Sequence, residues 1–365
     1  MSASIRSNIL EMQPYQPGKP ASEVQRELGL VNIIKLASNE NPLGPSPRAI
    51  VAVRESADQM HLYPDGSAYE LKKAISGRFG IDVSHIMVGN GSDNLIHLLG
   101  LIFLGSPNDE VVVGDPSFVR YDATANLAPC KLTRVPLDSS YTHDLTAMRA
   151  AVTDQTKLVF IANPNNPTGT IIRTHELTSF LRDLPEHVYT VLDEAYFEFA
   201  EDVIGYPRST THVQDGHRVI GLRTFSKTYG LAGIRIGYGF APSEIVDAID
   251  RVREPFGVNS LAQAAAIGAL GDSEHIRATV KNNREGIARV ASMLQRTGAK
   301  VCESYANFVF ADLGKPSAPI VSELLKRGII IRGGGIFGTP NCIRISIGTP
   351  DELDRLEAAL NEVTQ

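Results

Sequence analysis

Between about residues 85 and 255, short apolar runs alternate with helical patterns, and this alternation restricts the possible fold more than any other feature of the chain. Several runs are apolar almost throughout, which is typical of strands covered on both faces of a mostly parallel sheet. The runs are residues 86–90, 110–115, 131–137, 158–162, 189–193, 219–225 and 234–240. The alternation predicts a doubly wound α/β domain.

The pattern changes after Pro255. An Ala-rich stretch at 260–270 leads into a long helical pattern that ends near Arg296. Beyond it we expect an α+β unit, with strands at 308–312, 329–332 and 343–347 and helices at 322–326 and 351–363. Residues 1–45 are rich in proline, which favours an extended arm over an independent domain. The expected parts are therefore an N-terminal arm (1–45), a large domain (46–255) and a small C-terminal domain (256–365).

Charge and composition exclude several classes of protein. The chain has 35 Lys and Arg against 41 Asp and Glu, a net charge of −6, and no long basic run, which argues against a nucleic-acid partner. The most apolar stretch, residues 95–104, is too short for a membrane span of about 20 residues. The first nineteen residues lack the pattern of a secretory signal. The three cysteines are far apart, so we expect a cytoplasmic protein without a structural metal.

Two segments resemble nucleotide-binding motifs but lack a required feature. Residues 333–338 match G-x-G-x-x-G, yet they lead into a strand instead of opening a helix, and a mobile glycine loop is expected there. Residues 221–228 resemble a P-loop in which Ser226 replaces a glycine, which removes the backbone conformation that gathers amides around phosphates. Neither segment predicts a nucleotide site.

Polar residues at the ends of four predicted strands are not explained by folding alone. At 88–93 a strand ends in two glycines and a helix begins, so the amides of Gly91, Ser92 and Asp93 suit a phosphate group. At 163–169 two prolines flank Asn166 at the carboxyl edge of the sheet, where ligands of such sheets bind, although an ordinary turn would look similar.

The other two segments carry charged residues. Asp193 ends a buried strand, where an ionised carboxylate needs a partner. A salt bridge, a helix cap or an acid–base pair with Glu194 all remain open, although adjacent strand residues point to opposite faces. Lys227 lies among small residues after another strand, where desolvation would lower its pKa and yield a nucleophilic amine. Arg235, eight residues on, is a candidate phosphate clamp.

Together the four segments offer the groups that pyridoxal 5′-phosphate (PLP) needs. The motifs N-P-N-N-P-T-G at 163–169, D-E-A-Y at 193–196 and S-K-T-Y-G-L-A-G-I-R at 226–235 resemble, in order and spacing, those of the fold-type I, PLP-dependent aminotransferases. Within that group the chain is most similar to the histidinol-phosphate aminotransferases, from about Pro14 to the C-terminus. The resemblance implies an aspartate-aminotransferase-like fold, in which a mostly parallel seven-stranded sheet forms the PLP-binding large domain. The arm would then belong to the small domain and the dimer contact.

The resemblance also implies cofactor contacts, residue by residue. Lys227 would be the catalytic lysine that binds PLP covalently and moves the transferred proton, and Asp193 would pair with the pyridine nitrogen. Asn166 and Tyr196 would hydrogen-bond the phenolic oxygen of the ring, and Phe118 would stack on its face unless it is only a core residue. The residues expected around the cofactor phosphate are Gly91, Ser92, Asp93, Thr224, Ser226 and Arg235, with Tyr63 reaching across a homodimer interface.

For the substrate, the resemblance implies that Arg344 grips the α-carboxylate and Arg332 faces a phosphate. Tyr15 and Asn39 of the arm would touch the substrate. The implied reaction is transamination of L-histidinol phosphate with 2-oxoglutarate to imidazole-acetol phosphate and L-glutamate, in histidine biosynthesis. An aromatic amino-acid aminotransferase, a PLP-dependent decarboxylase of threonine phosphate and a non-catalytic PLP-binding regulator remain alternatives, because pocket shape decides substrate choice.

Overall fold

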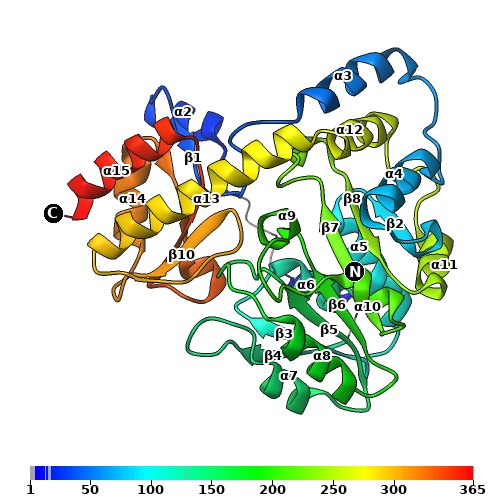
Figure 1. Ribbon diagram of the computed structural model, residues 1–365. Coiled ribbons are helices and arrows are strands. Elements are labelled where there is room, and N and C mark those ends of the chain that lie inside the picture. The colour runs from blue at the N-terminus through cyan, green and yellow to red at the C-terminus, as the bar shows by residue number, and fades with distance from the viewer. Residues whose placement is uncertain (1–4, 13, 15–17, 129, 365) are drawn as a thin grey trace.

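In the computed structural model, which describes residues 5–12, 14, 18–128 and 130–364, seven strands form the central sheet (Figure 1). They are β2 (Ile86–Gly89), β3 (Glu110–Asp115), β4 (Lys131–Pro136), β5 (Thr156–Ala162), β6 (Tyr189–Asp193), β7 (Val219–Thr224) and β8 (Gly237–Phe240). Their order is β2-β8-β7-β6-β5-β3-β4, and only β8 runs antiparallel to its neighbours among these strands. The predicted α/β class with a mostly parallel sheet is confirmed.

Alternate residues of the central strands face different helix layers. Val111 and Val113 pack with α5 (Ser92–Phe103), α6 (Val119–Leu127) and α11 (Ser243–Val252) on one face of the sheet. Val112, between them, packs with α7 (Leu145–Ala151) and α8 (Thr174–Asp183) on the other. This two-residue period explains why the strands read as continuous apolar runs, since both faces are covered.

The remaining helices of this part surround the sheet and its edges. They are α3 (Pro47–Ser56), α4 (Tyr69–Phe79), α9 (Phe197–Ala200), α10 (Ser209–Gln214) and α12 (Ser260–Leu270), with short 3-10 helices η1 (Ala57–Gln59), η2 (Val83–His85) and η3 (Ala232–Ile234). Within the described part of the chain, no helix is both long enough and apolar enough to cross a membrane.

The C-terminal part builds a second, smaller sheet in the order β12-β13-β10-β9. Its strands are β9 (Lys300–Val301), β10 (Phe308–Asp312), β12 (Arg332–Gly333) and β13 (Cys342–Ser346), and its helices are α13 (Ser273–Arg296), α14 (Ala318–Lys326) and α15 (Pro350–Thr364). One apolar cluster joins this sheet to the three helices. Residues 334–337, within the glycine-rich segment, form the 3-10 helix η4 (Gly334–Phe337).

The N-terminal segment is not a wholly extended arm, and that expectation was wrong. It contains α1 (Ser7–Glu11) and α2 (Ala21–Leu28). Pro20 immediately precedes α2, a position where the missing N–H of proline costs no helical hydrogen bond. Further on, β1 (Ile34–Lys35) pairs in parallel with β11 (Ile329–Ile330), so the segment joins the C-terminal part. This pairing agrees with the expected placement of the arm beside the small domain. The division at residues 45 and 255 stays a prediction, and α12, which lies beyond residue 255, packs in one apolar cluster with residues of the large sheet.

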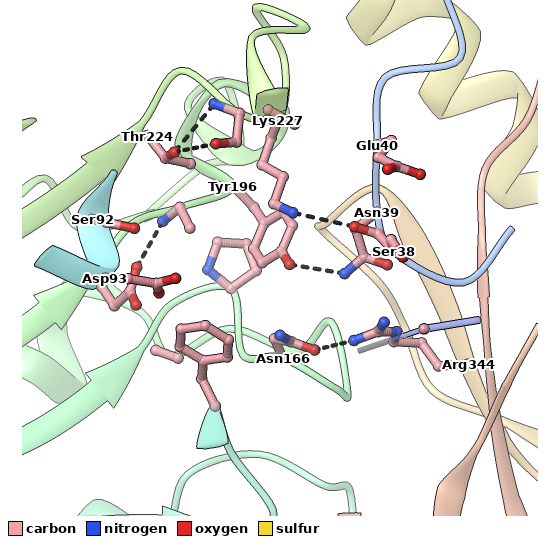
Figure 2. Close-up of a pocket in the computed structure, with 18 of the residues that line it drawn as sticks. Ser38, Asn39, Glu40, Ser92, Asp93, Asn166, Tyr196, Thr224, Lys227 and Arg344 are labelled. Carbon is pink, nitrogen blue, oxygen red and sulfur yellow. Dashed lines mark hydrogen bonds between the residues drawn. The ribbon is translucent and has the colours of Figure 1, made fainter. Parts of the chain in front are cut away.

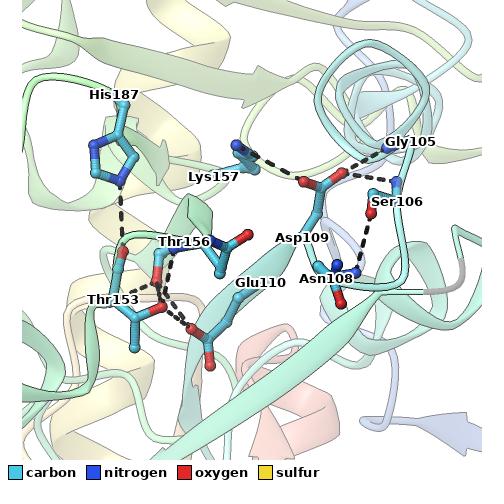
Figure 3. Close-up of polar contacts among 10 residues, drawn as sticks. Gly105, Ser106, Asn108, Asp109, Glu110, Thr153, Thr156, Lys157 and His187 are labelled. Atoms are coloured by element: carbon cyan, nitrogen blue, oxygen red, sulfur yellow. Dashed lines mark hydrogen bonds and ion pairs between the residues drawn. The ribbon is translucent and has the colours of Figure 1, made fainter.

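The buried carboxylate of Glu110 connects the amino ends of three neighbouring strands, β4, β3 and β5, and Figure 3 shows its contacts with Thr153 and Thr156. Glu110, only 2% exposed, accepts hydrogen bonds from Lys131 Nζ (2.6 Å), Thr133 Oγ1 (2.6 Å), Thr153 Oγ1 (2.5 Å) and Thr156 Oγ1 (3.2 Å). Burial alone would raise the pKa of Glu110, but the hydrogen bonds from Lys131, Thr133 and Thr153 outweigh it and lower the pKa to about 2. This network lies at the edge opposite to the carboxyl ends of the strands.

Candidate active site

The carboxyl ends of β5, β6 and β7 and the segment after β1 surround a cavity of about 240 Å³ (Figure 2). In open α/β sheets, ligands bind at this edge. The structure brings thirteen of the predicted site residues to its wall: Asn39, Ser92, Asp93, Phe118, Asn166, Asp193, Tyr196, Thr224, Ser226, Lys227, Arg235, Arg332 and Arg344. The motifs that were far apart in the sequence therefore share one site.

Lys227 extends into the cavity from the loop after β7 (Figure 2). Its Nζ donates to the carbonyl oxygen of Ser38 over 3.4 Å and lies 5.7 Å from the ring centre of Tyr196. Burial, with a contribution from the positive charge of Arg344, lowers the pKa of Lys227 to about 8. A larger fraction of the side chain is therefore the neutral, nucleophilic amine near pH 7 than for an exposed lysine.

Asp193 ends β6 and is 4% exposed. Its Oδ2 accepts a hydrogen bond from the hydroxyl of Tyr121 (2.7 Å), and its Oδ1 accepts one from the amide of Ala195 (3.1 Å). Burial raises the pKa of Asp193 to about 6, although these two hydrogen bonds oppose the rise. The carboxylate is held in one orientation at the wall of the cavity.

The neighbouring carboxylate, Glu194, has a different partner. It accepts from Arg223 Nε at 2.8 Å, and both side chains are buried. It also accepts from the amide of Ser209 (2.8 Å) and the hydroxyl of the same residue (2.5 Å). Of the alternatives left open for Asp193, an acid–base pair with Glu194 is not formed, because Glu194 is paired with Arg223 whereas Asp193 faces the cavity. The alternation of side chains along the strand explains why the two acids separate.

A group of donors for an anion lies where α5 begins. The first amides of a helix have no intrahelical acceptor, so those of Ser92 and Asp93 can serve a phosphate. Arg235 Nη2 lies 3.8 Å from Asp93 Oδ2, and the hydroxyls of Thr224 and Ser226 are 3.0 Å apart. All of these residues line the cavity.

Gly91 lies directly before the first turn of α5, and its amide donates to the carbonyl of Gly89 (2.8 Å). Its expected contact with a phosphate stays a prediction. Its φ is +79°, and a Cβ placed there would lie 2.5 Å from Arg235 Nη2. Glycine is therefore needed here for its backbone conformation and for the space that the guanidinium of Arg235 occupies.

Two arginines approach the cavity from the small sheet. Arg332 of β12 and Arg344 of β13 are directly opposite each other in the strand pairing. Arg344, 6% exposed, donates through Nη1 to Asn166 Oδ1 (2.5 Å) and through Nη2 to the carbonyl of Ala37 (2.7 Å), and its guanidinium lies 5.3 Å from the ring centre of Phe337. Two adjacent cations make this side of the cavity complementary to an anionic substrate.

Asn39 contacts a tyrosine of the site. Its Nδ2 donates to the hydroxyl of Tyr196 over 2.9 Å (Figure 2), and its Oδ1 accepts from the hydroxyl of Ser346 over 2.7 Å. The φ of Asn39 is +55°, a conformation that asparagine tolerates better than most residues. Asn39 thus positions Tyr196, and a direct contact with substrate stays a prediction.

Two of the predicted residues are not at the cavity wall. Tyr63 is 82% exposed and stacks on Phe256, with ring centres 4.6 Å apart. Gly91 lies behind Arg235, as described above. A third, Tyr15, lies outside the described residues. Phe118 is at the wall and also packs edge-on against Tyr121, so it combines the two interpretations that the sequence allowed.

Tyr121 was not predicted as a site residue. It is 1% exposed, stacks on Phe160 at 4.6 Å and donates to Asp193. A signal was present, because Tyr121 follows Phe118 by three residues and residues so spaced share a face when the segment is helical. No set of three or more His, Cys, Asp and Glu side chains arranged to hold a metal occurs among the described residues.

Comparisons with known proteins agree with this geometry. The profile described as Aminotransferase class I and II matches residues 31–360. The chain therefore belongs to the class I and II aminotransferases, and its cofactor is PLP. An aspartate aminotransferase from Thermus thermophilus with maleate, 23% identical, shares the fold with a TM-score of 0.84 and covers 98% of this chain and 99% of its own. The family, fold and cofactor expected from the motifs are confirmed.

Within that family, the chain is similar to histidinol-phosphate aminotransferases. The protein of that name from Moorella thermoacetica is 45% identical over 359 residues, which cover 98% of this chain and 92% of its own. Histidinol-phosphate aminotransferase 2 from Carboxydothermus hydrogenoformans is 46% identical over 346 residues, 95% of either chain. The histidinol-phosphate aminotransferase from Sinorhizobium meliloti, solved with PLP, superposes with a TM-score of 0.91 at 31% identity and covers 99% of this chain and 98% of its own.

Proposed function

We propose that this protein transfers the amino group of L-histidinol phosphate to 2-oxoglutarate, giving imidazole-acetol phosphate and L-glutamate, as a step of histidine biosynthesis in the cytoplasm. The observation that carries the proposal is the pair of arginines, Arg332 and Arg344, side by side at the cavity that holds Lys227. A phosphorylated amine and a dicarboxylic acid are both complementary to such a pair. Relatives 41–46% identical to the chain carry the name of this activity.

The side chains of the cavity fit PLP. Tyr121 and Ala195, which donate hydrogen bonds to Asp193, are both neutral. The protonated pyridine nitrogen would therefore supply the positive charge that a buried carboxylate needs. Lys227 would bind the aldehyde, and Phe118 would lie against the ring. The phenolic oxygen would be held by Asn166 and Tyr196, and the phosphate by the amides of Ser92 and Asp93 with Thr224, Ser226 and Arg235.

PLP supplies an electron sink that makes the proton on the amine-bearing carbon of the donor acidic. Nζ of Lys227 would take this proton and later return one, and the burial that lowers the pKa of this amine favours the neutral form that can accept a proton. The carboxylate of Asp193 keeps its charge and its orientation through the hydrogen bonds from Tyr121 and Ala195. Asn39 keeps the hydroxyl of Tyr196 directed at the cavity.

We also propose that the enzyme works as a homodimer in which Tyr63 reaches the cofactor phosphate of the neighbouring subunit. Tyr63 is 82% exposed. Met60 (66% exposed) and Leu62 (57% exposed) are close to it in the sequence, and Phe256 (48% exposed) stacks on its ring. Large apolar side chains gathered at a surface support a protein interface. Light scattering after size exclusion tests the dimer, and a monomer that retains full activity would contradict the role of Tyr63.

Single-turnover absorbance with histidinol phosphate tests the reaction. The PLP-loaded enzyme should lose its cofactor absorbance band on mixing with this amine and regain it on addition of 2-oxoglutarate. A higher kcat/KM for phenylalanine than for histidinol phosphate would identify an aromatic amino-acid aminotransferase. Release of carbon dioxide without an oxo acid would identify a decarboxylase. No spectral change with histidinol phosphate would end the proposal.

A further inference from the structure

Thr228, the residue after Lys227, is completely buried, and two residues from distant parts of the chain bind it. Its carbonyl oxygen accepts a hydrogen bond from Asn41 Nδ2 (2.9 Å), and its hydroxyl donates one to Glu198 Oε2 (3.3 Å). Neither Asn41 nor Glu198 lines the cavity that contains Lys227. We call these two hydrogen bonds to Thr228 the Thr228 clamp.

Asn41, the first residue of the clamp, is itself held in one orientation. Its Oδ1 accepts from the amide of Leu43 (3.0 Å), and its Nδ2 also donates to Thr279 Oγ1 of α13 (3.1 Å). Nδ2 of an asparagine has two hydrogens, so the contacts with Thr228 and Thr279 use both. A rotation of the amide would break these hydrogen bonds together, and Asn41 therefore connects Thr228 firmly to α13.

Glu198, the second residue of the clamp, lies in α9, which begins directly after Tyr196. It is 4% exposed, and burial raises its pKa to about 7, although the positive charge of Arg223 opposes the rise. A carboxyl group keeps an oxygen that can accept a hydrogen bond whether or not it is protonated. The hydroxyl of Thr228 therefore has an acceptor on both sides of neutral pH.

The segment that carries Asn41 also contacts the other end of the lysine. The carbonyl of Ser38 accepts from Lys227 Nζ (Figure 2), whereas Asn41, three residues on, binds the residue after the lysine. The amide of Gly230 donates to the carbonyl of Lys227 (3.0 Å), and a side chain at Gly230 would collide with the carbonyl of Gly44. The loop of Lys227 is thus packed closely against one N-terminal segment.

This arrangement bears on how Lys227 works. A lysine side chain is flexible, so the position of Nζ is defined only as well as the backbone from which it extends. A misplacement of about 1 Å, caused by a change far from the reacting atoms, can cost roughly a hundredfold in rate. The Thr228 clamp is placed to prevent such a displacement, because it holds the next peptide unit from two elements.

We propose that Asn41 and Glu198 are positioning residues for the transamination, which hold Thr228 and thereby fix the backbone of Lys227 and the direction of its Nζ. This inference rests on the role proposed for Lys227 and does not depend on which amine is the donor. It assigns a part in the reaction to two side chains outside the cavity wall.

The first test removes the hydroxyl of the clamp and follows the donor half-reaction by single-turnover absorbance. The donor is histidinol phosphate or, where the wild type ignores it, phenylalanine. Thr228→Val should lower the maximal rate roughly tenfold or more and leave the half-saturating donor concentration within about twofold, because the arginines that bind the donor are not moved. Thr228→Ser keeps the hydroxyl and should restore most of the rate. Asn41→Ala releases the carbonyl of Thr228 and should resemble Thr228→Val, so the clamp can be tested even where one variant folds poorly.

The second test measures the lysine itself in the full-length apoenzyme, without turnover. Reductive methylation with formaldehyde and cyanoborohydride labels neutral amines, and peptide mass spectrometry gives the labelling rate at Lys227 as a function of pH. The midpoint for the wild type should lie at about 8. Thr228→Val and Asn41→Ala should move it upward, because a lysine that is no longer held in place is less buried.

Thr190→Val is the matched control. Thr190 is also completely buried, and its hydroxyl has no hydrogen-bond partner in the described part of the chain. This variant should change neither the rate nor the labelling midpoint. Loss of thermal stability in Thr228→Val and Asn41→Ala without a change in rate or midpoint would overturn the clamp, as would a Thr228→Ser variant as slow as Thr228→Val. Turnover retained by Lys227→Ala would instead contradict the role proposed for Lys227, and the clamp would fall with it.

Discussion

Replacing Glu110 by glutamine should destabilise the fold through loss of a buried charge, at a place far from the active site. Glutamine keeps the size of the side chain but removes the negative charge that faces Lys131 and the hydroxyls of Thr133, Thr153 and Thr156. One pKa unit corresponds to about 1.4 kcal/mol. A fall from 4.5 to about 2 therefore corresponds to about 3 kcal/mol of stability above pH 5.

The sign of the pH dependence follows from the direction of the change in pKa. Because folding lowers the pKa of Glu110, its contribution is complete above the unfolded value of 4.5 and disappears as the pH falls towards 2. Wild type and Glu110→Gln should therefore differ most at pH 7 and converge in acid. For 365 residues that unfold together, about 3 kcal/mol corresponds to roughly 4 °C in Tm.

Circular dichroism melts at pH 7 and at pH 3 measure this difference. Glu323→Gln is the matched control, because Glu323 also pairs with two cations, Lys326 and Arg327, but is 42% exposed. Exposed ion pairs contribute little to stability, so this variant should melt close to the wild type. A loss for Glu110→Gln that is equal at both pH values, or no larger than that of the control, would refute the reasoning.

Three further predictions concern the active site. Tyr121→Phe should weaken PLP binding about tenfold, because Asp193 loses the hydrogen bond from Tyr121. The loss should be larger at pH 6 than at pH 8, since removal of this hydrogen bond raises the pKa of Asp193 further. Equal losses in equilibrium titrations of PLP at the two pH values would contradict this. The rate of PLP uptake by the apoenzyme should rise with pH around a midpoint of about 8, the pKa of Lys227. Arg344→Gln should move that midpoint upward, since it removes a positive charge near Lys227. An unchanged midpoint in the variant would contradict the role of Arg344. Arg332→Ala should cost about 2 kcal/mol, roughly thirtyfold in kcat/KM, for histidinol phosphate and less for phenylalanine, and equal losses would refute its phosphate role.

The strands could be predicted because their apolar runs end abruptly at polar residues or glycine. The strands expected at 110–115, 189–193 and 308–312 have the predicted bounds. The site residues supplied by the loops after β5, β6 and β7 followed from the same reasoning, because residues after parallel strands gather at one edge. The local sequence was therefore sufficient to predict a functional residue where that residue lies at the end of a strand or in the loop directly after it.

Contacts that depend on the packing of distant segments were not predictable. Tyr121 and Asp193 are 72 positions apart, and their hydrogen bond depends on how α6 packs beside the carboxyl end of β6. The pairing of Ile34–Lys35 with Ile329–Ile330 involves two residues on each side, too short a signal for a sequence pattern. The helices of the N-terminal segment were missed because proline was taken as a sign of extended chain, although it is tolerated just before a helix.

The pairing of β1 with β11 has a consequence for synthesis on the ribosome. Ser38 and Asn39 leave the ribosome some 290 residues before the strand that fixes them in place. Arg344 and Ser346, which bind the same early segment, follow later still. A nascent polypeptide can therefore form much of its central sheet while the catalytic pocket stays incomplete, so coenzyme capture would favour chains in which translation has passed Ser346.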